Sequence, residues 1–159
     1  TDDHLLLVLM QRATGTSFTH VVFQGDPQLL TAILGKQVDV LGLNLGPVSA
    51  NPDKLRTVAM AGASRSPFRP EVPTLKELGI DVVMGSERGI VAPAATPPAV
   101  MAKLREAMAD VAKDPEFIRV MRARFTEPDF EDGEAWFTRL RGLQEGYRTL
   151  WERTPWAQR

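Results

Sequence analysis

Apolar residues follow two patterns along this chain. Between residues 1 and 93, short apolar runs of strand character alternate with helical segments, whereas residues 97–159 show helical spacing almost throughout. Strands that alternate with helices favour a parallel, open α/β sheet, which is the fold class expected for the first part. The expected strands are 18–23, 38–41, 56–61, 82–84 and 89–92.

The first expected helix covers residues 5–14. Asp2 and Asp3 stand at its start, where acidic side chains are favoured, and Gly15 stands at the position that commonly ends a helix. The apolar run 5–10 also suits a buried strand, and periodicity alone does not decide between the two.

Capping residues mark two more helices in the first part. Asp26 suits the N-cap and Pro27 the first position of a helix that Gly35 ends. Residues 74–77 have the spacing of a capping box. They predict a short helix that ends at Gly79.

The second part predicts three helices. The first covers residues 98–113, the second has Asp114 as N-cap and Pro115 at its first position, and the third begins at Asp132. Each carries an apolar stripe at spacings of three or four residues. The stripes are Val100, Met101, Leu104, Met108 and Val111; Phe117, Ile118, Met121 and Phe125; and Trp136, Leu140, Leu143, Tyr147 and Trp151.

Composition excludes several classes of protein. The 159 residues, 43% hydrophobic and 25% charged, suit one globular domain or two small lobes rather than a disordered or fibrous chain. A net charge of −1 argues against a nucleic-acid partner or an anionic membrane surface. The absence of cysteine excludes disulfides, cysteine-based zinc sites and thiol nucleophiles.

The residue types that form enzyme active sites do not occur here at spacings typical of catalysis. His4 and His20 lie in different elements without metal-ligand spacing, so His20 is interpreted as a half-buried packing or hydrogen-bonding residue. The acidic residues between 129 and 134 are interpreted as the solvated start of a helix. We therefore expect no catalytic residue, no metal, no cofactor and no enzymatic activity.

Anion capture at a helix start is the better hypothesis. The expected strand 18–23 leads through Gln24, Gly25 and Asp26 into a helix, whose free N–H groups point out of the edge where ligands of open α/β sheets bind. The simpler interpretation is an ordinary connection between strand and helix. Asp26 would also compete with a bound anion for the same N–H groups.

Arg88 is a second candidate for holding an anion. It follows Ser86 and Glu87 just before an expected strand, where the chain could cross between lobes. A guanidinium can hold a carboxylate through two hydrogen bonds. An ordinary surface ion pair with Glu87 or Asp81 explains Arg88 equally well.

Several short motifs occur in an order that resembles one family. They are Gly15-Thr16-x-Phe18-Thr19-His20-Val21-x-Phe23-x-Gly25, residues 29–40, residues 54–56, residues 65–67 with 70–74, residues 89–93 with Thr96-Pro97, and Asp114-Pro115-Glu116. Their order over most of the chain is similar to that of the tripartite tricarboxylate transporter receptors, also called Bug solute-binding proteins. The resemblance implies a periplasmic-binding-protein fold of type II, with two α/β lobes around a cleft.

The resemblance also implies a function. Members of this family are extracytoplasmic receptors that capture small carboxylates and deliver them to membrane transporter subunits. The ligand is a tricarboxylate, a dicarboxylate or an acidic amino acid, and loops between strands and helices hold it largely through backbone N–H groups. The family contains no enzymes, and its location implies a signal peptide removed ahead of Thr1.

The family's ligand loops can be carried over residue by residue. The usual Tyr-Lys-Gly stands here as Phe23-Gln24-Gly25, and the usual Asp-Asn as Leu43-Asn44, so a hydroxyl and charges are lost. The start of the chain matches the end of a Ser/Gly-rich anion loop. The implied ligand-binding residues are Thr1, Asp3, Phe23, Gln24, Gly25, Asp26, Asn44, Ser86 and Arg88.

Family members are about twice as long as this chain. We expect residues 1–88 to form lobe two, and 89–159 to supply a crossover strand and the helices of the largely missing lobe one. The apolar stripes of those helices then pack on lobe two in a rearranged way, pair with a second copy, or meet the missing N-terminal half. The alternative function is a truncated homologue that acts as an interaction or sensor module.

Overall fold

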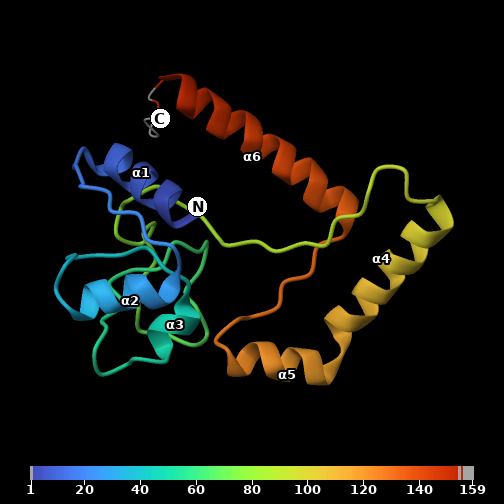
Figure 1. The fold of residues 1–159 in the computed structure, drawn as a ribbon, viewed down its shortest axis with the longest axis horizontal. Helices are drawn as coiled ribbons and strands as arrows, with labels where there is room; N and C mark the ends of the chain where they lie inside the picture. Colours follow the sequence, from blue (N-terminus) through green and yellow to red (C-terminus); the bar gives the residue numbers. More distant parts are fainter. Residues whose placement is uncertain (1, 154, 156–159) are drawn as a thin grey trace. The chain divides into compact units, whose positions relative to one another are not determined.

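The computed structural model describes residues 2–153 and 155, and the chain divides into two compact units, 1–88 and 89–159 (Figure 1). Unit 1 contains α1 (Asp2–Thr14), α2 (Asp26–Leu34) and α3 (Leu45–Ser49), joined by long irregular connections. Unit 2 contains α4 (Pro98–Lys113), α5 (Pro115–Ala123) and α6 (Gly133–Arg153). In the described residues, no helix combines the length and the apolar character needed to span a bilayer.

Two helices of unit 1 agree with the sequence patterns. The helical interpretation of 5–14 is confirmed, although α1 begins three residues earlier, and Gly15 follows it with φ of 67°. In α2 the N-cap is Gly25, so the prediction that Asp26 is the N-cap was wrong by one residue. Asp26 is instead the first helical residue, where the helix dipole still favours its negative charge.

The expected sheet is not formed in the described residues. The five segments predicted as strands belong to no strand, and the ladder is reduced to one isolated parallel bridge between Met60 and Thr74. The Met84 N–H also donates to the Ala61 carbonyl oxygen at 2.7 Å. A strand needs a continuous row of hydrogen bonds to a neighbour as well as a suitable sequence, and these isolated contacts do not extend into a ladder.

Side-chain exposure agrees with the missing pairings. The most exposed apolar side chains of the extended segments are Val21, Val22, Val40, Val58, Val83, Ile90 and Val91, each at least half exposed. The core of unit 1 is small. Its buried apolar residues are Val8, Ala32, Val72, Leu75 and Val82.

The predicted capping box forms its hydrogen bonds without a helix. The Thr74 N–H donates to Oε2 of Glu77 at 2.7 Å, and the Glu77 N–H donates to the Thr74 hydroxyl at 3.1 Å. The residues that follow form turns, so the expected short helix was wrong. Gly79 does end the segment, with φ of 81°.

The three helices of unit 2 are confirmed. Asp114 caps α5 by accepting the Phe117 N–H at 2.7 Å, as its position before Pro115 predicts. Asp132 accepts the N–H groups of Glu134 and Ala135 at 2.9 and 3.1 Å at the start of α6. No residue of α4, α5 or α6 is buried, so these helices are positioned by their caps and short connections rather than by a core.

Candidate functional site

The starts of α1 and α2 and the loop before α3 come together in unit 1. Gly42 lies against Asp3, because a Cβ built on Gly42 would stand 3.3 Å from the Asp3 carbonyl oxygen and 3.6 Å from its Cα. The charge of Asp26 acts on the carboxyl group of Asp3. The contact with Gly42 and the electrostatic influence of Asp26 thus relate the predicted residue Asp3 to two segments far from it in the sequence.

The carboxyl group of Asp3 has a shifted pKa. Partial burial raises the pKa of its carboxyl group above the usual 3.8, and the negative charges of Asp2 and Asp26 raise it further. A carboxyl group with a raised pKa takes up a proton more readily than an exposed aspartate.

The start of α2 offers unused hydrogen-bond donors. Within the described residues, the backbone N–H groups of Asp26 and Gln28 have no backbone acceptor, and Pro27 has no N–H. Gly25 has no side chain to cover these donors and is itself only half-buried. Free N–H groups at the positive end of a helix are suited to an anionic oxygen.

Asn44 supplies the polar side chain nearest to this loop in sequence. It is the N-cap of α3, yet its side chain makes no capping hydrogen bond, and the residue is half-buried. Its amide therefore keeps two donors and an acceptor for other partners. Phe23 is also half-buried, whereas Gln24 is exposed.

The remaining predicted ligand-binding residues are Ser86, Arg88 and Thr1. Arg88 donates from Nη1 to the Ser86 hydroxyl at 3.3 Å, and both side chains are exposed. In the described part of the chain, no hydrogen bond or ion pair joins either of them to Asp3, Gly25 or Asn44. Thr1 lies outside the described residues.

A histidine pair stands beside the site. The rings of His4 and His20 meet edge to face with centroids 4.7 Å apart, and Nε2 of His20 is hydrogen-bonded to Oε1 of Gln11. Both residues are half-buried, which confirms the interpretation of His20 as a packing and hydrogen-bonding residue. The described residues contain no group of three or more histidine or acidic side chains suited to a metal ion.

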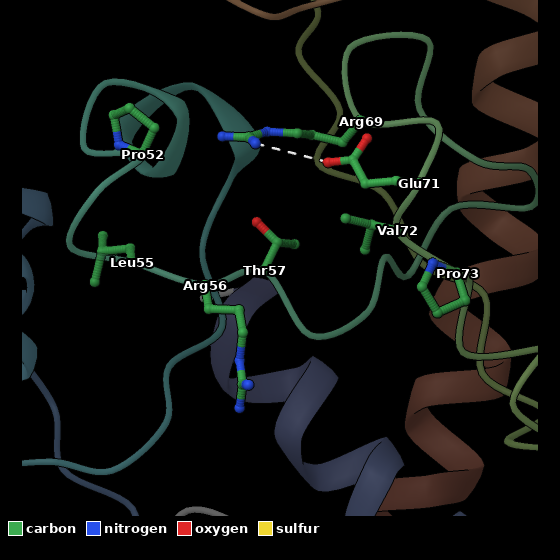
Figure 2. Close-up of a pocket in the computed structure, with 8 residues that line it drawn as sticks. All are labelled: Pro52, Leu55, Arg56, Thr57, Arg69, Glu71, Val72 and Pro73. Atoms are coloured by element: carbon green, nitrogen blue, oxygen red, sulfur yellow. Dashed lines mark ion pairs between the residues drawn. The ribbon is translucent and has the colours of Figure 1, made fainter.

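A shallow pocket lies elsewhere in unit 1 and was not predicted (Figure 2). It has a volume of about 340 Å³ and is lined by Pro52, Leu55, Arg56, Thr57, Arg69, Glu71, Val72 and Pro73. Arg69 is paired with Glu71 at 3.7 Å, and Figure 2 shows the Arg56 side chain turned away from that pair. None of the predicted site residues lines this pocket.

Comparison with protein families gives one clear result. The model of the tripartite tricarboxylate transporter family receptor matches residues 1–136. A UPF0065 protein from the gbd 5′ region of Cupriavidus necator is 31% identical over 132 residues, which are 82% of this chain and 40% of that protein. The chain thus spans about two fifths of the length of this curated relative.

Solved structures show the same relationship. A TctC solute binding protein from Polaromonas superimposes with a TM-score of 0.76 at 26% identity, over 96% of this chain and 54% of that one. MatC from Rhodopseudomonas palustris with bound malate gives 0.69 at 26%, over 79% and 44%. An R. palustris protein with adipate gives 0.84 at 20%, over 96% and 52%, and supports the fold alone.

Proposed function

Because this chain belongs to the tripartite tricarboxylate transporter receptor family, we propose that it is a solute-binding receptor, or the ligand-binding part of one, for a small carboxylate. The ligand class is a dicarboxylate, a tricarboxylate or an acidic amino acid. Malate in the related MatC supports this class. The receptor delivers its ligand to membrane transporter subunits from the periplasm.

The observation that carries this proposal is the convergence of Asp3, Gly42 and Asp26. Gly42 lies against Asp3 on the loop that leads to Asn44, and the charge of Asp26, at the start of α2 with its two unused N–H groups, acts on the Asp3 carboxyl group. A ligand carboxylate accepts the N–H groups of Asp26 and Gln28, and the Asn44 amide binds a second oxygen. Hydrogen bonds to a charged oxygen are each worth about 1.5–3 kcal/mol.

Three aspartates near the site shape the ligand preference. A fully ionised ligand is repelled by the negative charges of Asp2, Asp3 and Asp26. Partial burial and the charges of Asp2 and Asp26 raise the pKa of Asp3, which favours its uncharged form and lessens this repulsion. Ser86 and Arg88 belong to the proposed ligand-binding set through the family resemblance alone.

Calorimetric titration tests the proposal. The chain is titrated with malate, adipate, citrate, glutamate and terephthalate, and we expect saturable binding of at least one of them. Asn44→Ala should weaken that binding about tenfold or more, because one hydrogen bond to a charged oxygen is lost. Gln37→Ala removes an exposed amide at the far end of α2 and should leave binding unchanged.

A different outcome would refute the proposal. The proposal is excluded if no member of the panel binds to this chain or to a longer chain that matches its relatives in length. Equal affinity in Asn44→Ala and in the unaltered chain would leave the receptor function intact and place its ligand elsewhere.

A second candidate function is an interaction module. Unit 2 exposes several large apolar side chains from its helices, among them Phe137 at 60% and Val100 at 46%. Such a surface fits a protein partner, a second copy of the chain or the missing half of the receptor. A sedimentation measurement of self-association separates this candidate from a receptor that acts as a monomer.

A further inference from the structure

The chain contains only two histidines, and they touch each other. His4 lies in the first turns of α1, and His20 lies in the extended segment 16–24 that leads to α2. Gln11, one helical heptad after His4 on the same face of α1, accepts the Nε2–H of His20. His20 is therefore held on α1 by two side chains at once.

Segment 16–24 has few other attachments. Within the described residues, no backbone–backbone hydrogen bond involves any of its nine positions. Besides the bond between His20 and Gln11, its polar contact with α1 is a hydrogen bond between the hydroxyl groups of Thr14 and Thr16, whose oxygen atoms lie 2.7 Å apart. Val21 and Val22 are 55% and 82% exposed, so packing contributes little at these two positions.

We propose that the His4–His20 pair is a proton-operated latch that holds segment 16–24 on α1 and so positions Gly25 and Asp26 at the site. The inference rests on the proposed function only for its effect on ligand binding. The latch is closed when the rings are neutral, because two charged rings in edge-to-face contact repel each other. It opens when both rings carry a proton.

The charges around the pair determine the direction of the effect. Asp2 and Asp3 neighbour His4 in the first turn of α1, where negative charges favour a charged ring, whereas the positive end of that helix disfavours one. Repulsion and burial prevail at His4. Its pKa is lowered, first by burial and then by the charge of His20.

The sign of the pH dependence follows. A histidine of the unfolded or opened chain titrates near 6.5, and His4 in the closed latch titrates below that value. The closed form therefore keeps its full stability above pH 6.5 and loses it as the pH falls from 6.5 towards the lowered pKa of His4. The chain has no histidine outside this pair, so no further histidine affects the stability of the closed form in this pH range.

Pulsed electron–electron distance measurements test the latch. Because the chain has no cysteine, Ala13→Cys on α1 and Val22→Cys in the segment give two unique spin-label sites, both exposed. We expect a narrow distance distribution at about pH 7.5, and a broader and longer one at about pH 5, below the ordinary histidine pKa of about 6.5. The helical circular-dichroism signal should stay unchanged over this range.

Three variants in the labelled background make the test specific. His20→Gln and His4→Gln each remove one of the two charges and should abolish the pH-dependent broadening. Thr19→Gln alters an exposed neighbour in the same segment and should keep it. The latch is refuted if the unaltered pair gives the same distribution at both pH values, or if the broadening accompanies loss of helical signal.

Malate titration of the unlabelled chain links the latch to the site. If binding needs the closed form, the affinity falls by about tenfold per pH unit for each proton that must leave, and this fall is absent in His20→Gln. Movement of the labels without malate binding supports the latch and counts against malate as ligand. Malate binding with no movement of the labels supports the proposed function and refutes the latch.

Discussion

Thr74 is one of two buried polar residues in the described part of the chain, and it is only 2% exposed. Its N–H and its hydroxyl both pair with Glu77, whose carboxylate is also held by Nε of Arg65 at 3.0 Å. The Thr74 N–H and then Arg65 lower the pKa of Glu77. The pairing fixes the turn beneath which Leu75 is buried.

Removal of the Thr74 hydroxyl should therefore destabilise unit 1. Thr74→Val leaves the Glu77 N–H without its acceptor, and we expect a loss of about 1 kcal/mol in the free energy of unfolding. Urea denaturation followed by circular dichroism measures the loss. Thr74→Ser keeps the hydroxyl and should lose clearly less, and an equal loss in both variants would show that the hydroxyl contributes no more than the methyl group.

Capping chemistry at single residues could be predicted from the sequence because it depends on neighbours within three positions. Asp114 and Asp132 cap their helices as expected, and Gly15 and Gly79 adopt positive φ where the pattern ends an element. Thr74 and Glu77 also pair as expected, yet no helix follows them. Whether a cap leads into a helix depends on what the next turn packs against.

At the scale of elements, helices were predicted better than strands. A helix satisfies its own hydrogen bonds, so α4, α5 and α6 follow from local periodicity. A strand depends on a distant partner, and Val21, Val22 and Val40 remain exposed instead of entering a ladder. The bridge between Met60 and Thr74 is the only ladder contact in the described residues.

One extended segment of unit 2 is held closely against a helix. A Cβ on Gly89 would collide with the ring carbons Cη2 and Cζ3 of Trp136 in α6. Only glycine therefore allows the chain to pass the indole at this distance. In contrast, a Cβ on Gly142, in the interior of the same helix, would meet nothing within 4 Å.

These two glycines make a matched pair of substitutions. Gly89→Ala should cost about 1–3 kcal/mol, because the indole or the backbone must move. Gly142→Ala should stabilise α6 by about 1 kcal/mol, because alanine is the better helix former and has open space here. Thermal unfolding measures both, and the Trp136 emission should shift only in Gly89→Ala when the other two tryptophans are replaced by phenylalanine.

For this pair, the opposite result would be informative. A neutral Gly89→Ala with unchanged emission would mean that the indole adjusts freely and that residues 89–92 are not held by α6. A destabilising Gly142→Ala would mean that the exposed face of α6 is covered in solution.

At the scale of the whole molecule, the ligand-binding roles of all the residues named from the sequence stay predictions. The contact of Gly42 with Asp3 and the influence of Asp26 on the pKa of Asp3 join segments more than fifteen residues apart, so local sequence patterns could not predict them. The pocket at Arg69 and Glu71 left no signal in the sequence, because neither residue belongs to a recognisable ligand motif.

The uncovered helices of unit 2 lead to a prediction for the chain in solution. Exposed side chains on these helices and their connections include Val100, Leu104, Val111, Phe130, Phe137 and Leu143. Burying one such side chain is worth about 1.5–3 kcal/mol, so an interface with a few of them reaches micromolar affinity. We expect the chain to bind a hydrophobic dye and to sediment faster as its concentration rises.

Phe137→Lys makes this prediction specific, since Phe137 is 60% exposed. A charge placed among the apolar side chains must be desolvated on association, so the variant should bind less dye and sediment as a monomer over a wider concentration range. Val22→Lys adds the same charge at an even more exposed position of unit 1 and should leave both properties unchanged. If the chain stays monomeric and binds no dye at any concentration, its own residues cover these helices in solution. Neither a second copy nor a further part of the receptor would then be needed to cover them.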